Sequence, residues 1–472
     1  MKKLWILILS LAVLFMSGCE RRPTPTAPGE TAGNGITELT IWTTDEPRFF
    51  ESLGREFASQ IGAANLRFKV VTFEEDIEMQ QVIVNSLSEG LGPDIIFTDG
   101  EWIAGNPRKL TMAKVESGFT PDNFRNTFVQ SANDALLVGE TGILGVPMAV
   151  DSLALLFNDE HLTDRLPDRN TPSTTWEGLR EDAAVLSKKD NSFERFTVSG
   201  VALGRTDNIN YGAEIIENIM LQSGVEFFDA SQTLATFDKT EAVAAGGRKV
   251  NAGVEAVNFY TSFADERYKN HSWNAALADS STTDKDLRTF AKGKTSMVFA
   301  KAQDLPRLQA IIDDLEATNE DPIDDDNIRV AFLPQVEDPQ ISPNRKVVGD
   351  VKALAVTRDS KFPDTAWRFL KFAIQKDNLQ KWHEETLMPS PRLDLLLEQE
   401  QVPLVGIYVR QAKFARANLM PIPKAYFYEA LKPGVEAINA GRMSSERALE
   451  TSAFTVSKIL QQEISRAKSI ER

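Results

Sequence analysis

The stretch GILGVPMAVDSLALLFN, residues 142–158, contains two extended apolar segments that are interrupted by the polar pair Asp151 and Ser152. Before this stretch, short β-rich runs alternate with helical patterns, whereas after it long helices predominate and strands are few. We therefore predict that the chain crosses at this point from one lobe of an α/β fold to a second lobe.

The segment before the crossing has the pattern of repeated β-loop-α units. Phe49, Phe50, Leu53 and Phe57 recur at helical spacing, and β-rich runs flank them. The predicted elements are strands at 39–43, 66–72 and 94–97 and helices at 47–60 and 79–88. Strands that alternate with helices predict a mainly parallel sheet flanked by helices, with ligand sites beyond the carboxyl ends of the strands.

The chain is long enough for two domains, because about 437 residues follow the N-terminal segment described below. After the crossing, helices are predicted from Thr174 and Thr175 to about residue 189, at 211–222 and at 250–263, followed by strands at 294–300, 328–333 and 347–356 and by helices to the end. The predicted division is lobe 1 at 36–148 and 286–348, and lobe 2 at 149–285 and 349–472, including the C-terminal helices.

Residues 1–18 have the pattern of a bacterial lipoprotein signal. Lys2 and Lys3 precede an apolar run too short to span a bilayer, and Ser17 and Gly18 stand directly before Cys19, the only cysteine of the chain. This end resembles a lipobox, although Met16 stands where leucine is usual. An ordinary secretory signal with an incidental cysteine is the alternative. The segment 19–35, rich in Pro, Thr and Gly, predicts a disordered tether, so that a lipid on Cys19 would anchor an extracytoplasmic protein at the cell surface or in the periplasm.

Composition excludes several classes of function. The formal net charge is −16, and loss of Lys2 and Lys3 would make it −18, which argues against nucleic acid as a partner. No second apolar run approaches membrane-spanning length, so a permease or a channel is not expected. His161, His271 and His383 lack metal-ligand spacing, and no nucleophile elbow or phosphate loop is present, so we expect no metal, no cofactor and no enzyme activity.

Eight stretches together resemble the extracellular solute-binding proteins of ABC importers, the family that includes maltose-binding protein. They are LTIWTTDEP (39–47), GPDIIFTDGEWIA (92–104), ILGVPMAVDSLALLFNDEHL (143–162), PSTTWEGLREDA (172–183), YGAEIIENIMLQSGV (211–225), FAKGKTSMVFA (290–300), VVGDVKALAVTRDSKFPDTAWRFLKFAI (347–374) and KWHEETLMPSPR (381–392). The resemblance implies a two-lobed periplasmic-binding-protein fold of type II, with the ligand cleft between lobes. It also implies a monomer that delivers a solute, most readily a sugar or oligosaccharide, to a membrane permease.

Candidate ligand-binding residues follow the predicted strands of the first lobe. They are Thr44, Asp45 and Glu46 after the first strand, and Asp99, Glu101 and Trp102 after the third. Carboxylates accept hydrogen bonds from sugar hydroxyls, and an aromatic ring can stack on the C–H face of a sugar. Two alternatives remain open at this stage, namely that Asp45 caps the next helix and that Trp102 is a core residue.

Further candidates come from the crossings and from the second lobe. They are Asp151 and Ser152 in the first crossing, Asn210 and Tyr211 at the start of a helix that resembles the family's cleft-facing helix, Trp273 in a polar loop, and Gly349 and Asp350 in a late crossing. Trp273 lies in the loop KNHSWNAALADS, which has no apolar periodicity, and we expect its ring to stack on the ligand. Surface capping is the alternative for Asn210 and Tyr211.

Two other functions are compatible with the sequence. A lipoprotein glycoside hydrolase would use two of the many carboxylates as acid and base. A binder of a peptide, an osmolyte, an amino acid or a polyamine could use the same scaffold, with cationic residues or aromatic cages in its cleft.

Overall fold

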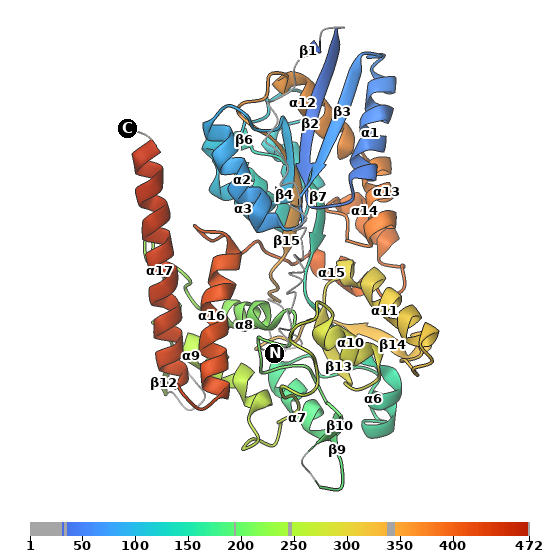
Figure 1. Ribbon diagram of the computed structural model, residues 1–472, viewed down its shortest axis with the longest axis vertical. Helices are drawn as coiled ribbons and strands as arrows, with labels where there is room; N and C mark the ends of the chain where they lie inside the picture. The colour runs from blue at the N-terminus through green and yellow to red at the C-terminus, as the bar shows by residue number, and fades with distance from the viewer. Residues whose placement is uncertain (1–30, 33–34, 193–194, 244–247, 338–344, 471–472) are drawn as a thin grey trace, which may run out of the picture.

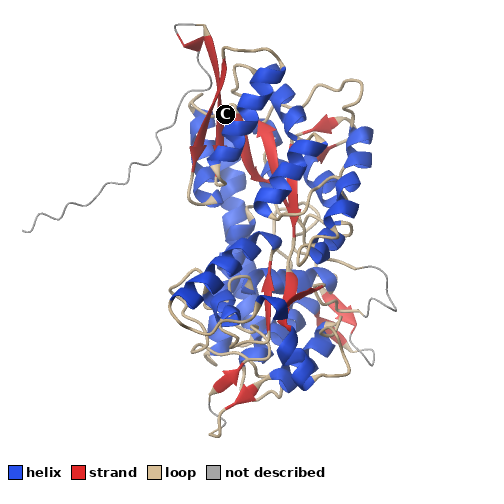
Figure 2. Cartoon of the chain, turned by 90° about the vertical axis from the view of Figure 1, so that its right-hand side faces the viewer, coloured by secondary structure: helices blue, strands red, loops and turns tan. Residues whose placement is uncertain are grey.

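The computed structural model describes residues 31–32, 35–192, 195–243, 248–337 and 345–470. Two lobes lie one above the other along the long axis of the molecule, as Figure 1 shows. In each lobe helices flank a β-sheet (Figure 2). The predicted α/β fold with two lobes is therefore confirmed.

The first lobe is built on a six-stranded sheet with the order β1-β2-β4-β15-β7, in which β3 pairs with β2. Its strands are β1 (Thr31–Ala32), β2 (Ile36–Thr43), β3 (Leu66–Thr72), β4 (Ile95–Asp99), β7 (Val146–Asp151) and β15 (Asp350–Val356). The predicted β-loop-α units are present. The sheet is mixed rather than mainly parallel, because β15 runs antiparallel to both β4 and β7.

Helices cover the first sheet on both faces, and short elements connect them. They are α1 (Pro47–Gln60), α2 (Asp76–Ser88), α3 (Gly100–Gly105), η1 (Pro107–Lys109), α4 (Pro121–Thr127), α5 (Gln130–Leu136), β5 (Leu137–Val138), β6 (Gly142–Ile143), α12 (Pro363–Ala373), α13 (Lys376–Thr386) and α14 (Leu393–Gln399). The core contains an aromatic cluster in which the Trp382 ring lies 4.7 Å from Phe49 and 5.4 Å from Phe97. This cluster fastens α1 and α13 to the sheet.

The second lobe contains a three-stranded antiparallel sheet, β13-β8-β14, within a larger share of helices. Its strands and hairpins are β8 (Ala154–Asn158), β9 (Lys188–Lys189), β10 (Phe196–Val198), β11 (Glu241–Val243), β12 (Lys249–Asn251), β13 (Met297–Ala300) and β14 (Ile328–Ala331). Its helices are α6 (Asp159–Arg165), α7 (Trp176–Leu186), α8 (Gly212–Gln222), α9 (Ala252–Thr261), η2 (Ser262–Ala264), α10 (Lys285–Ala291), η3 (Ala302–Asp304), α11 (Leu305–Ala317), η4 (Asp325–Asn327), α15 (Gly406–Ala412), α16 (Lys424–Asn439) and α17 (Ser445–Ile470).

The pairing of strands corrects the predicted division of the chain. Residues 286–348 were assigned to lobe 1, but β13 and β14 pair with β8 and therefore belong to lobe 2. The segment 349–472 was assigned to lobe 2, but β15 enters the first sheet and α12 packs on it. The chain crosses between lobes at 152–153, between β14 and β15, and again between α14 and α16.

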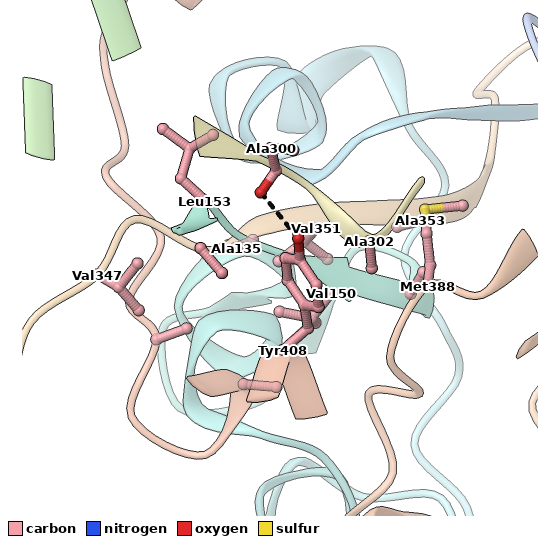
Figure 3. Close-up of a cluster of buried hydrophobic side chains, with 14 of the residues drawn as sticks. Ala135, Val150, Leu153, Ala300, Ala302, Val347, Val351, Ala353, Met388 and Tyr408 are labelled. Carbon is pink, nitrogen blue, oxygen red and sulfur yellow. Dashed lines mark hydrogen bonds between the residues drawn. The ribbon is translucent and has the colours of Figure 1, made fainter. Parts of the chain in front are cut away.

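A buried apolar cluster surrounds the first crossing, as Figure 3 shows. Val150 and Val351 come from the first sheet, Ala300 ends a strand of the second sheet, and Leu153 lies between the two sheets. Tyr408 of α15 is fully buried among them and donates a hydrogen bond to the carbonyl of Ala300 over 3.2 Å. This cluster joins the ends of the two sheets at the boundary between the lobes.

Candidate functional site

A cavity of about 280 Å³ lies where the lobes meet. The first lobe contributes residues from α2, α3 and the adjoining edge of its sheet, and the second lobe contributes residues from α8, the segment after β13, and α16. The cavity is lined by Asp76, Ile77, Gln80, Asp99, Glu101, Trp102, Asp151, Glu214, Lys301, Gln303, Asp350, Lys352, Met388, Pro423, Lys424, Ala425 and Tyr428. Its volume approaches that of pockets that bind small molecules, which begin at about 300 Å³.

The register of the first sheet brings charged side chains together at one edge. Asp350 at the start of β15 lies opposite Asp151 at the end of β7, and Lys352 lies opposite Asp99 at the end of β4. The ammonium of Lys352 is 2.9 Å from Asp99 and 2.6 Å from Asp76. These contacts, opposed by burial, raise the pKa of Lys352, so the lysine stays charged.

Two lysines of the second lobe complete an ionic network across the cleft. Lys301, directly after β13, lies 2.5 Å from Asp350 and 2.9 Å from Glu214 of α8. Lys424 of α16 lies 3.2 Å from Asp350 and 3.3 Å from Glu101 of α3. Asp350 thus contacts both lysines, and Lys424 links a helix of one lobe to a helix of the other.

Burial and neighbouring charge shift the pKa values of the carboxylates in this network in opposite directions. Burial raises the pKa of Glu101 to about 7 and the pKa of Glu214 to about 8, although Lys424 and Lys301 act against these shifts. Burial also acts on Asp350, but there the two lysines prevail and lower its pKa. Near neutral pH, Asp350 is therefore the charged partner of the lysines, while Glu101 and Glu214 hold protons for part of the time.

Asp151 has a structural role at the floor of the cavity. Its carboxylate accepts hydrogen bonds from the backbone amides of Ser152 and Ala302 at 2.8 and 3.1 Å, and from that of Gln303 at 3.0 Å. Burial raises its pKa to about 6 despite these bonds. Asp151 therefore ties the first crossing to the segment after β13, and it sets the position of Lys301.

The structure brings five of the predicted site residues to the wall of the cavity. They are Asp99, Glu101, Trp102, Asp151 and Asp350. Trp102 is only 5% exposed and also lines an adjoining groove of about 470 Å³ between α2 and α17, so it is both a core residue and part of the wall.

Three further predicted residues lie next to the cavity without lining it. The Thr44 hydroxyl donates to Asp76 over 2.9 Å, and burial raises the pKa of Asp45, which lies near Lys352. Tyr211 donates a hydrogen bond from its hydroxyl to Asp304 over 3.0 Å, and the Lys301 ammonium lies 5.0 Å from its ring centre. Thr44 and Tyr211 thereby support residues of the wall.

The remaining predicted residues have structural roles. Glu46 is the exposed N-cap of α1 and pairs with Arg48, and Ser152 is buried and accepts a hydrogen bond from Gln411. Asn210 is exposed and donates its backbone amide to Asp286, while the amide of Gly349 donates to the carbonyl of Arg416. A Cβ on Gly349 would lie 2.8 Å from the Cβ of Ala415, so close packing explains this glycine.

Trp273 is the clearest correction to the predicted site. The side chain is fully buried, and its indole N–H donates to the side-chain oxygen of Asn208 over 3.0 Å. Because the ring has no exposed face, it does not stack on a ligand in this structure. The polar residues before Trp273 suggested an exposed loop, but Asn270 and Ser272 are themselves buried. The Ser272 hydroxyl donates to the carbonyl of Val201 over 3.0 Å, and the Asn270 amide donates to the hydroxyl of Ser262 over 2.8 Å.

Sequence reasoning missed the second lobe's share of the site. Lys301 directly follows a predicted strand, so the rule that found Asp99 also applied to it. Glu214 is one of two charged residues of α8, and it is 5% exposed. Lys424 and Tyr428 stand one helical turn apart on α16, and only the tertiary fold shows that this face meets the cleft.

Comparison with known families decides what kind of protein has this geometry. Residues 54–402 match the sequence profile of bacterial extracellular solute-binding proteins. The chain belongs to this family. A comparison of its sequence with curated proteins gives no significant match.

Solved structures of solute-binding proteins share the fold at low identity. A solute-binding protein from Thermotoga lettingae bound to α-D-tagatose is 21% identical over 90% of this chain and 99% of its own, with a TM-score of 0.64. The sugar-binding protein MalE from Xanthomonas citri is 14% identical over 92% and 99%, with a TM-score of 0.72. A cyclic α-maltosyl-1,6-maltose binding protein from Arthrobacter globiformis is 17% identical over 91% and 100%, with a TM-score of 0.67.

Membrane-spanning helices and metal-binding clusters are both absent from the described part of the chain. No helix there is both long and apolar enough to cross a membrane. Within the same residues, no group of three or more histidine, cysteine or acidic side chains is arranged to hold a metal ion.

Proposed function

We propose that this protein is the substrate-binding component of an ABC importer, which captures a small carbohydrate between its lobes and delivers it to a membrane permease. The observation that carries the proposal is the cavity at the lobe boundary, whose wall combines polar groups of both lobes with the ring of Trp102. The sugar-binding proteins named above share its fold, which supports a carbohydrate as the ligand class.

Solute binding would favour closure of the lobes. A ligand in this cavity touches Glu101 and Trp102 on one side and Glu214 and Lys301 on the other, so its full set of contacts exists only when the lobes are together. Such differential contacts shift a hinged protein toward its closed form. The apolar cluster around Tyr408 supplies the pivot, because it joins the ends of both sheets.

The proposal includes no catalysis. Asp76, Asp99 and Asp350 are held by lysines, and Asp151 by backbone amides, so these carboxylates act as structural and recognition groups. Incubation of the protein with oligosaccharides is expected to release no reducing ends. Release of reducing ends would favour a glycoside hydrolase instead.

A thermal-shift screen over mono- and disaccharides tests the proposed ligand class. A sugar that binds only the folded protein stabilises it by mass action and therefore raises the melting temperature. The stabilisation is about 2.7 kcal/mol when the free sugar concentration is 100 times its Kd. We expect at least one sugar to do so. A screen in which amino acids, peptides or polyamines raise the melting temperature and no sugar does would overturn the carbohydrate assignment.

The Trp102→Ala variant locates the site within the molecule. Loss of the indole from the cavity wall is expected to weaken binding of the sugar identified in the screen by about 1–3 kcal/mol, measured by calorimetry. Trp367→Phe, at a buried tryptophan on α12, is the control and should leave affinity unchanged. Equal affinity of Trp102→Ala and the wild type would place the ligand elsewhere.

We also propose that Cys19 carries the lipid that holds this protein near its permease. Cys19, the signal at 1–18 and nearly all of the tether at 19–35 lie outside the described residues, so the proposal rests on the sequence alone. Mass spectrometry of the mature protein is expected to show an acylated N-terminal Cys19. A mature chain that starts at another residue without acyl groups would contradict the anchor and leave the binding role intact.

A further inference from the structure

The cavity has more carboxylates than cations, and its cations are already engaged. Six carboxylates and three lysines line it. Lys352 contacts Asp76 and Asp99, Lys301 contacts Glu214 and Asp350, and Lys424 contacts Glu101, Glu217 and Asp350. Since each lysine contacts at least two carboxylates, an anionic solute would have to compete with them, and the wall disfavours it.

Two carboxylate oxygens in this wall lack a hydrogen-bond donor. Oε1 of Glu101 and Oε1 of Glu214 are buried and accept no hydrogen bond, although the Glu101 oxygen lies 3.3 Å from the Lys424 ammonium outside hydrogen-bond geometry. Glu214 is 5% exposed and lines the cavity from the second lobe, while Glu101 lines it from the first. Buried acceptors of this kind are normally satisfied, so a donor on each side of the cavity would stabilise the ionised forms of Glu101 and Glu214.

A protonated amine meets both requirements of this wall. A neutral hydroxyl donates one hydrogen bond but leaves the excess negative charge uncompensated. An ammonium group supplies up to three donors together with the missing positive charge, and its hydrogen bonds to carboxylates are roughly twice as strong as neutral ones.

Resting on the proposed function, we propose that the solute is an amino sugar whose protonated amine is bound between Glu101 of the first lobe and Glu214 of the second. Because these residues belong to opposite lobes, the amine would itself help to close the cleft. The sugar ring would lie beside Trp102, whose indole forms part of the same wall.

Amine binding is expected to release protons. Lys424, Asp350 and Asp99 act on Glu101, and Lys301, Asp350 and Glu217 act on Glu214, while burial keeps both pKa values high, at about 7 and about 8. A bound ammonium favours the ionised carboxylates, so affinity for it should rise as pH rises from about 6 to about 7.5. A neutral sugar has no charge to drive this release.

Calorimetry on the full protein with matched sugars tests the proposal. Glucosamine, galactosamine and mannosamine are each compared with the neutral parent sugar, the N-acetyl derivative, which lacks the charge, and the uronic acid. We expect one amino sugar to bind at least about tenfold more tightly than its parent and its N-acetyl derivative, with heats that depend on the ionisation enthalpy of the buffer. A parent sugar that binds as tightly as the amine overturns the inference and leaves the proposed function standing. If no sugar of any charge binds, the proposed function and the inference both fail.

The Glu214→Gln variant tests the residue assignment. It keeps the shape of the side chain and removes its charge, so the ratio of amino-sugar to parent-sugar affinity should fall from at least about tenfold to about one. Glu316→Gln, on the exposed face of α11, is the control and should keep the ratio. A Glu214→Gln protein that retains the ratio and the proton release overturns the role of Glu214.

Discussion

Replacement of Lys301 by methionine is expected to lower the free energy of unfolding by about 3–5 kcal/mol at neutral pH. Lys301 is 8% exposed, and its ammonium lies within 3 Å of both Asp350 and Glu214. Methionine has a similar length but no charge, so it leaves Asp350 with Lys424 alone and removes the partner of Glu214. Urea unfolding followed by tryptophan fluorescence measures the loss.

The pH dependence identifies the cause of this loss. Lys301 and Lys424 lower the pKa of Asp350, so its ion pairs stabilise the fold above its ordinary pKa of 3.8 and lose this effect as pH falls. The difference between Lys301→Met and the wild type should therefore persist down to about pH 4 and shrink only below it, because Asp350 takes up a proton first in the unfolded chain and then in the folded protein. A difference that stays constant with pH would point to lost packing instead.

An exposed lysine provides the matched control. Lys381 pairs with Glu56 over 2.8 Å, but both side chains are about half exposed. Lys381→Met should cost no more than about 1 kcal/mol, because solvent screens the pair. If Lys301→Met and Lys381→Met cost the same, the network across the cleft contributes no more to stability than a surface ion pair.

The start of the fold was predictable because its signals are local. Helical spacing at Phe49, Phe50, Leu53 and Phe57 and the β-rich runs around it predicted α1, β2 and β3 with bounds close to those observed. Sheet membership was not predictable in this way. The composition of the strand at 297–300 does not indicate whether it pairs in the first or the second sheet. Its pairing with β8 joins residues about 140 positions apart in the sequence.

Only part of the candidate site was predictable, again because the sequence shows local patterns but not tertiary contacts. Asp99 and Glu101 were found because polar residues at strand ends of an α/β sheet converge, and Asp350 was found because it lies in a predicted late crossing between lobes. Glu214 and Lys424 lie on helices, where the sequence shows that a charge is present but not which face meets the cleft. The contacts between Lys424 and Glu101 depend on the relative position of the two lobes, which no local pattern encodes.

Replacement of Trp273 by alanine is expected to destabilise the second lobe by about 3–5 kcal/mol without a change in sugar affinity of the folded protein. The ring is fully buried, and its N–H bonds Asn208. The amide group of Asn208 donates in turn to the carbonyls of Asn274 and Ala278, so the tryptophan supports the loop that follows it. Thermal unfolding and calorimetry with the identified sugar measure the two effects separately.

The Trp273→Phe variant separates volume from hydrogen bonding. Phenylalanine fills most of the space but has no N–H, so the side-chain oxygen of Asn208 loses its donor, at a cost of about 1–3 kcal/mol. The order of stability should be wild type, Trp273→Phe, Trp273→Ala, with equal affinities in all three. A stable Trp273→Ala protein that binds sugar weakly would instead show that the Trp273 ring contacts the ligand. Such a contact requires the loop at 274–278 to open in the bound state. The buried Nε1 bond to Asn208 argues against such opening, because it would leave both polar groups to find new partners.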